Sequence, residues 1–260
     1  MTTLLAPFTL IGALVLAAVR EAGEITLFAG RIIGKVLAGG RGSGQFLRQC
    51  AFVGVDSLPI ILLTAFFTGG VLALQSFNGL DGGPLVNTQV AKLVALSMLR
   101  ELGPVLAGLM LASRVGAAMA AELGTMRVTE QIDALQTLAT NPLRYLVVPR
   151  VMACVLMLPL LVILANMTGI WGGYVVGTEM LGIPAHMYMN STFEAISSED
   201  LTMGLVKATV FGLLVGVMAT YHGFGARGGA AGVGQATTRA VVYGAVAILV
   251  ADYFITAMFV

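Results

Sequence analysis

The sequence predicts an all-α integral membrane protein with an N-terminal interfacial helix, five transmembrane helices and one short surface helix. Hydrophobic residues make up 58% of the 260 residues and charged residues only 10%, and the mean hydropathy is +0.93. Soluble domains carry about 25% charged residues, so this composition excludes a soluble globular domain. The apolar residues also gather into segments long enough to cross a bilayer.

The first 48 residues are predicted to form an interfacial, elbow-like region. Its apolar segment Leu4–Val19 has 16 residues and contains Pro7, whereas a span needs about 20 apolar residues. Further along, Glu24, Arg31 and Lys35 share one helical face opposite apolar residues, which is the pattern of a helix lying in the membrane plane. A thin sixth span over Leu4–Val19 is the alternative.

Five further segments have the length and apolarity of spans, and they place the whole chain, 1–260, in one transmembrane domain. The predicted spans are 51–77, 90–123, 151–178, 201–221 and 240–260. Lys207 is the single charge in the fourth of these segments, and Asp252 is the single charge in the fifth. The second segment contains several charges, which are considered below.

Glycines recur every four residues in two of these spans. They are Gly169, Gly173 and Gly177 in the third span, and Gly212 and Gly216 in the fourth. Small residues at this spacing let helices approach closely. Packing within the chain is the main interpretation, and an interface between subunits is the alternative.

The orientation follows from the cationic residues outside the spans, because cytoplasmic loops are enriched in Lys and Arg. Ten such residues precede the first span or lie in the loops after the second and fourth: Arg20, Arg31, Lys35, Arg41, Arg48, Arg127, Arg144, Arg150, Arg227 and Arg239. The loops 76–89 and 179–200 contain none. We therefore expect a cytoplasmic N-terminus and an external C-terminus.

Charges inside the predicted spans need partners or a function, because each costs about 2.5–3.5 kcal/mol near the bilayer centre. At 1.5 Å per helical residue, Arg100 lies roughly 12 Å below an outer boundary marked by Lys92. Asp252 reaches a similar depth, so Arg100, Glu101 and Asp252 are expected to meet. Pro104 has no N–H to offer the Arg100 carbonyl, so a local helix break is expected there.

Two interpretations of this charged group stay open. It is either a structural ion pair that fixes helix register, or a polar patch in an apolar cavity that suits the head group of an amphiphile.

The segment 127–139 is predicted to form a short helix at the inner membrane surface. Val128, Ile132, Leu135 and Ala139 fall on one helical face, with acidic residues on another. One interpretation is an interfacial helix that anchors the turn between two spans. The other is a coupling helix that docks into a cytoplasmic motor protein.

Motifs for catalysis and cofactor binding are missing from the sequence. No GxxxxGK[ST] motif is present, so we expect no ATP bound by this chain, and no nucleophile set or HExxH stands out. Gly223, Gly225 and Gly228 fit GxGxxG, but a predicted span rather than a strand precedes them. Cys50 and Cys154 have no metal-ligand spacing. We therefore expect no catalytic residue, no metal and no cofactor, and the net charge of +1 gives no indication of nucleic-acid binding.

Four segments together resemble the MlaE/YrbE family of ABC-transporter permeases. The longest reads LRELGPVLAGLMLASRVGAAMAAELGTMRVTEQIDAL, and NPLRYLVVPR follows it. The others are GGVLALQSF (69–77), GIWGGYVVG (169–177) and ATTRAVV (236–242). The resemblance runs from about residue 21 to the end, and for the first 20 residues the family suggests an elbow helix in the membrane plane.

The resemblance implies a homodimeric permease of a bacterial inner membrane that moves phospholipid between the inner and outer membranes and so maintains outer-membrane lipid asymmetry. It implies three partners: a cytoplasmic ABC ATPase that binds the ATP, a STAS-domain protein, and a periplasmic hexamer of MCE-domain proteins. By motif, the lipid-binding residues would be Arg100, Glu101, Leu72, Gln75 and Phe77, to which the depth estimate adds Asp252. The ATPase contact would be Glu130, Gln131 and Asp133.

A secondary, ion-coupled transporter of an amphiphile is the alternative function. Such transporters are often built from inverted repeats with paired broken helices. Five spans do not divide into two equal inverted halves, so the pattern favours a permease driven by a separate ATPase.

Overall fold

The computed structural model describes residues 2–37, 43–80 and 86–259, and these residues form helices and turns without a strand. The predicted all-α membrane class is confirmed. The α-helices in chain order are α1 (Thr2–Leu37), α2 (Ser43–Val53), α3 (Leu58–Gly79), α4 (Val86–Ser97), α5 (Gly103–Leu111), α6 (Ala117–Val128), α7 (Gln131–Thr137), α8 (Val148–Glu179), α9 (Ala185–Ala195), α10 (Ser198–Phe224) and α11 (Gly229–Phe259). Short turns of other geometry link some of them: the 3₁₀ turn η1 (Val55–Ser57) and the π-helical turns η2 (Met98–Leu102), η3 (Ala112–Gly116) and η4 (Leu143–Val147).

Five stretches within the described residues are long and apolar enough to cross a membrane, as predicted. They are Gln45–Gly79, Val86–Val128, Leu143–Glu179, Ser198–Phe224 and Gly229–Phe259. Each begins before the predicted start because helices continue past the charged and polar residues that limited the predicted segments. The largest difference is at the fifth, where Arg239 lies inside α11 instead of in a loop. Arg41, the loop 81–85 and Val260 lie outside the described residues.

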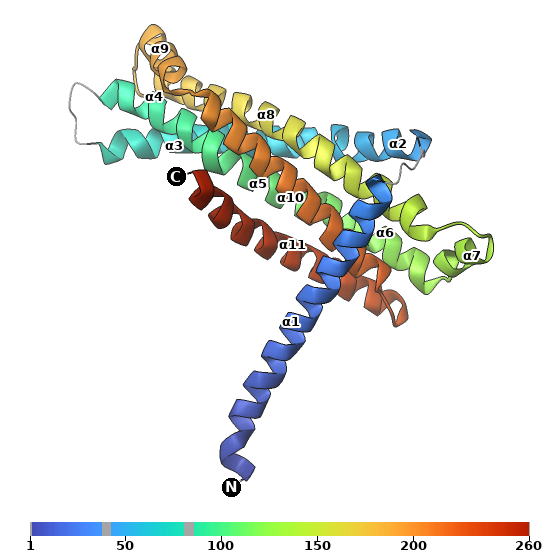
Figure 1. Ribbon diagram of the computed structural model, residues 1–260. Helices are drawn as coiled ribbons and strands as arrows, with labels where there is room; N and C mark the ends of the chain where they lie inside the picture. The colour runs from blue at the N-terminus through green and yellow to red at the C-terminus, as the bar shows by residue number, and fades with distance from the viewer. Residues whose placement is uncertain (1, 38–42, 81–85, 260) are drawn as a thin grey trace.

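The bundle has two distinct ends, which we call the α9 end and the α7 end after the short helices found there (Figure 1). α8 packs against α3 on one side and against α10 on the other. Glycine makes both contacts close: a Cβ on Gly69 of α3 would lie 1.8 Å from the Gly169 carbonyl oxygen, and one on Gly212 of α10 would lie 2.5 Å from the Cys154 carbonyl oxygen. The predicted small-residue faces therefore pack within the chain.

α1 is a single helix whose second half crosses the bundle and whose first half projects away from it (Figure 1). Its second half holds it there, because Phe28 and Ile32 are buried in a cluster with residues of η4, α8 and α10. Two phenols reinforce the contact: Tyr221 of α10 donates to Glu24 (3.1 Å) and Tyr243 of α11 donates to Glu21 (3.0 Å). The interfacial interpretation predicts such a crossing helix, although the side chains of residues 1–11 lie outside the described set.

The predicted surface helix 127–139 is divided in two. α6 continues to Val128, and Glu130 then adopts a left-handed conformation, with φ of 60°, before α7 begins at Gln131. Residues 138 and 139 follow the end of α7, where Ala139 also has a positive φ of 56°. The apolar face was predicted correctly at its centre, because Ile132 is fully buried against Leu123 and Leu146.

Candidate functional site

The site begins with the turn η2 in the second span. A proline cannot donate the backbone hydrogen bond that an α-helix requires, so Pro104 leaves the Arg100 carbonyl without its α-helical donor. The sequence predicted a break in the helix at this place. The structure instead has a π-helical turn, in which Gly103 N–H bonds to the Met98 carbonyl, and the helix continues into α5.

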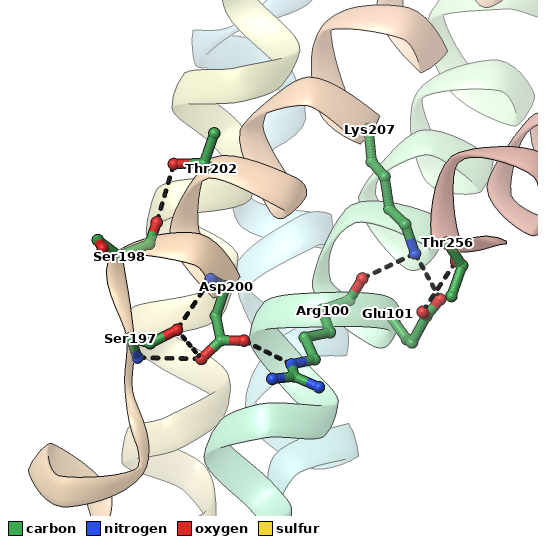
Figure 2. A network of polar contacts seen from close by, with 8 residues as sticks. All are labelled: Arg100, Glu101, Ser197, Ser198, Asp200, Thr202, Lys207 and Thr256. Atoms are coloured by element: carbon green, nitrogen blue, oxygen red, sulfur yellow. Dashed lines mark hydrogen bonds and ion pairs between the residues drawn. The ribbon is translucent and has the colours of Figure 1, made fainter. Parts of the chain in front are cut away.

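Lys207 of α10 supplies the missing donor. Its ammonium group lies 2.9 Å from the Arg100 carbonyl oxygen and 2.7 Å from Glu101 Oε2, as Figure 2 shows. It also lies 2.8 Å from Asp252 Oδ1 of α11, while Thr256 donates to Glu101 Oε1 at 3.1 Å. The lysine is fully buried. One cation thus faces two carboxylates and one freed carbonyl, and it ties η2 to α10 and α11.

Arg100 points away from this cluster. Its Nε donates to Asp200 Oδ1 at 2.5 Å, at the first turn of α10 (Figure 2). Asp200 is held in place by a capping box, because its carboxylate accepts from Ser197 N (3.0 Å) and Ser197 Oγ (2.9 Å). The arginine side chain remains 50% exposed, whereas the aspartate side chain is 3% exposed. The guanidinium is therefore oriented by one Nε contact and half open to its surroundings.

The predicted charged group is thus divided between two partners. Asp252 meets Glu101 through Lys207, as the depth estimate indicated, but Arg100 does not meet Asp252. Lys207, Asp200 and Thr256 were missed as site residues. Lys207 could have been found as the only charge in its span, and Asp200 as the acidic residue three positions after Ser197, which is a capping-box signature.

The other predicted lipid-binding residues lie on α3. Leu72 and Gln75 line an open, largely apolar groove of about 590 Å³, whose other residues are Ile60, Leu63, Thr64, Phe67, Thr68, Val71 and Met110. Phe77 does not line the groove and packs against the core instead. Arg100, Glu101 and Asp252 are also absent from its lining. Within this one chain, the charged and apolar parts of the predicted site are separate.

At the α7 end, the predicted ATPase-contact residues Glu130, Gln131 and Asp133 are all exposed. They differ in one respect, because Asp133 is engaged within the chain by Arg127, whose Nη1 lies 2.6 Å from Asp133 Oδ1. At the end of α7, a pocket of about 450 Å³ is lined by residues that follow the helix together with Gln136 and Phe224. Leu138 is 74% exposed nearby. The described residues contain no group of three His, Cys, Asp or Glu placed to hold a metal ion.

Comparisons with known proteins agree on one family. Residues 46–258 match the family described as Permease MlaE. A probable ABC transporter permease of Rickettsia prowazekii is 45% identical over 240 residues, 92% of each chain. The intermembrane phospholipid transport system permease protein MlaE of Haemophilus influenzae is 39% identical over 213 residues, 82% of this chain and 81% of that one. The chloroplast protein TRIGALACTOSYLDIACYLGLYCEROL 1 of Arabidopsis thaliana is 34% identical over 239 residues, 91% of this chain and 67% of that one.

Proposed function

The chain belongs to the MlaE family of ABC transporter permeases, and from this premise we propose that it moves phospholipid between the inner and outer membranes of a bacterium, driven by a separate cytoplasmic ATPase. In this proposal two copies form the permease, which lies in the inner membrane and helps to maintain outer-membrane lipid asymmetry. The α7 end is cytoplasmic and the α9 end periplasmic. A STAS-domain protein and a periplasmic MCE-domain hexamer complete the assembly.

The observation that carries the proposal is the half-open guanidinium of Arg100. Asp200 contacts its Nε, and the side chain is 50% exposed, which leaves the terminal nitrogens available to a ligand. Arginine binds phosphate with paired N–H donors in one plane, which makes it the preferred cation for phosphate groups. We assign Arg100 to the phosphate of the lipid head group, with Asp200 fixing its orientation.

The groove on α3 supplies the complementary apolar surface. Leu72 and neighbouring aliphatic and aromatic side chains line it, and Gln75 adds a polar group. Acyl chains need such an apolar lining, and glycerol esters accept hydrogen bonds from amides. In the proposed homodimer, this groove and the charged residues of η2 border a shared cavity for one amphiphile.

The α7 end is assigned to the motor. No nucleotide-binding loop is present in the sequence, so a transporter of this class requires ATP hydrolysis by another chain. Ile132 anchors α7 to the bundle, while Glu130, Gln131 and Leu138 are exposed, and a pocket adjoins the end of α7. This combination of a buried anchor and an exposed rim suits a helix that docks into a groove of the ATPase.

The first experiment tests the head-group site in proteoliposomes that contain the permease and its co-purified ATPase. Arg100→Ala is expected to insert and fold normally but to reduce ATP-driven lipid transfer at least tenfold. Asp200→Asn, which keeps an oxygen for Ser197, should give a smaller reduction. Loss of the folded Arg100→Ala protein would instead support a purely structural ion pair.

The second experiment tests the α7 assignment. Glu130→Lys reverses an exposed charge on the rim and is expected to reduce co-purification of the ATPase several-fold without lowering the amount of inserted permease. Glu179→Lys, the same charge reversal at the exposed last residue of α8 and far from α7, is the matched control. Equal ATPase recovery with Glu130→Lys and with the unchanged protein would contradict the assignment.

A secondary transporter is the second candidate, and the Lys207 cluster is the observation that favours it. Paired ionisable residues inside membrane spans can mark ion pathways and proton relays. The same proteoliposomes distinguish the two functions. Lipid transfer that requires a proton gradient and does not depend on ATP would contradict the ABC mechanism and support ion coupling.

A further inference from the structure

A second charged contact lies at η3, between the charged cluster and the α7 end, and the proposed function does not use it. Arg114 Nη1 donates to the Phe52 carbonyl oxygen at 3.3 Å and to Ser57 Oγ at 2.8 Å. Its Nη2 lies 3.8 Å from Asp56 Oδ2, and its guanidinium carbon lies 5.5 Å from the centre of the Phe52 ring. All four contacts reach the six-residue segment 52–57 of the first span.

That segment is where the first span departs from α-helical geometry. α2 ends at Val53, the 3₁₀ turn η1 follows, and α3 begins at Leu58. Carbonyl groups at such a junction need donors from outside the helix, and Arg114 provides one to Phe52. The junction is also confined on its other side, because a Cβ on Gly54 would lie 2.9 Å from Met157 Sδ of α8.

Arg114 joins two parts of the bundle that pack mainly on different neighbours. α2 and α3 pack mainly on α8, and α3 also touches α4 and α5, whereas α6 packs mainly on α10 and α11 and leads directly into α7. Arg114 sits at the start of the arm formed by α6 and α7, and its side chain holds the point where α2 meets α3. A short 3₁₀ segment between two α-helices can serve as a hinge.

We propose that Arg114 is a positioning residue that transmits movement of the α6–α7 arm to α3. When the motor displaces α7, Arg114 draws the 52–57 junction with it and changes the tilt of α3. The exposed face of α3 carries the groove with Leu72 and Gln75, so the tilt opens or closes that groove. This inference rests on the proposed function, because it assigns a coupling role within the same transport cycle.

The experiment measures lipid transfer and ATP hydrolysis together in proteoliposomes of the permease–ATPase complex. Arg114→Lys keeps the charge but cannot reach the carbonyl, the hydroxyl and the carboxylate at once. It is expected to bind the ATPase and to hydrolyse ATP within about twofold of the unchanged complex, with lipid moved per ATP reduced at least tenfold. Arg48→Lys, an exposed exchange of the same kind on α2, is the matched control and should leave the ratio unchanged.

A milder variant covers the case in which Arg114→Lys fails to fold. Ser57→Ala removes only the hydroxyl acceptor at 2.8 Å and is expected to lower the ratio of lipid to ATP about threefold. An unchanged ratio in Ser57→Ala and in any folded Arg114→Lys protein would overturn the inference, as would hydrolysis and transfer that fall in proportion. Absence of ATP-driven transfer by the unchanged complex would refute the proposed function itself.

Discussion

The second span contains two π-helical turns, η2 and η3, and they satisfy their charged residues in opposite ways. At η2, Glu101 contacts a fully buried lysine that it shares with Asp252 of another helix. At η3, Arg114 is held mainly by a carbonyl and a hydroxyl, and the neighbouring carboxylate of Asp56 is 3.8 Å away and 55% exposed. The first turn depends on charge balance in a buried place, and the second depends on hydrogen-bond geometry near an open surface.

The two turns also arise from different causes. Pro104 accounts for η2, because it removes the donor for the Arg100 carbonyl, and Lys207 then uses that carbonyl. No proline accompanies η3, whose residues are Ala112 to Gly116. Its position matches the level of the 3₁₀ junction in the first span, to which Arg114 is bound. We expect substitutions in the cluster of Glu101, Lys207 and Asp252 at η2 to act on stability, and substitutions at the Arg114 contacts of η3 to act on coupling.

The largest effect is expected from Lys207→Met. This change keeps much of the side-chain volume but leaves two carboxylates without their shared cation and the Arg100 carbonyl without a donor. Breaking a buried ion pair by removing one partner costs about 3–5 kcal/mol. The purified protein in detergent should therefore unfold at a clearly lower temperature, or accumulate poorly in the membrane.

A combined variant separates charge balance from packing at the same place. Adding Glu101→Gln and Asp252→Asn to Lys207→Met removes all three charges, and neutral replacements of a buried ionic group are often tolerated. Most of the lost thermal stability should return. A Lys207→Met protein that unfolds at the temperature of the unchanged protein would remove the basis of the contrast between η2 and η3.

The sequence predicts the five spans well but not the partners of their charges. Apolar length alone identifies a span, and it needs no knowledge of other helices. Partners depend on the relative depth and rotation of helices far apart in the chain. Depth counting brought Glu101 and Asp252 to one level, but it could not show that Arg100, the adjacent residue, faces a different side of the helix and meets Asp200.

The α7 region shows a second limit of the sequence. The apolar periodicity of 127–139 correctly predicts that Ile132 is buried. It does not reveal the left-handed Glu130 that separates α6 from α7, because glutamate carries no signal for a positive φ. It also cannot show that Asp133, one of the three expected ATPase contacts, is already paired with Arg127. Apolar periodicity predicts which face of a helix is buried, but it does not predict the residue at which the helix ends.

A smaller effect is expected from Asp200→Ala, which removes the partner of Arg100 from the capping box of α10. Only the carboxylate half of the capping box is lost, because Ser197 Oγ still accepts from the backbone N–H of residue 200. The cost should therefore lie at the lower end of the roughly 0.5–2 kcal/mol of a whole cap, and the half-exposed Arg100 side chain can find other polar partners. The temperature of thermal unfolding should fall by less than it does with Lys207→Met. Ser197→Ala removes the hydroxyl half of the capping box and keeps the carboxylate at Arg100, so it is the control for loss of capping with the Arg100 contact intact. If Asp200→Ala lowered the unfolding temperature as much as Lys207→Met does, the Arg100–Asp200 pair would matter as much for stability as the buried Lys207 cluster.

The smallest effect is expected from Asp56→Asn at η3. The change removes the charge opposite Arg114 but keeps a side-chain oxygen, and it leaves Phe52 and Ser57 in place. Partly exposed ion pairs contribute about 0–1 kcal/mol. The unfolding temperature and the ratio of lipid moved to ATP hydrolysed should therefore both stay close to those of the unchanged complex. If Asp56→Asn lowered that ratio as far as Arg114→Lys does, the charge of Asp56 would be what holds Arg114. The two turns would then work alike, because each would depend on an ion pair.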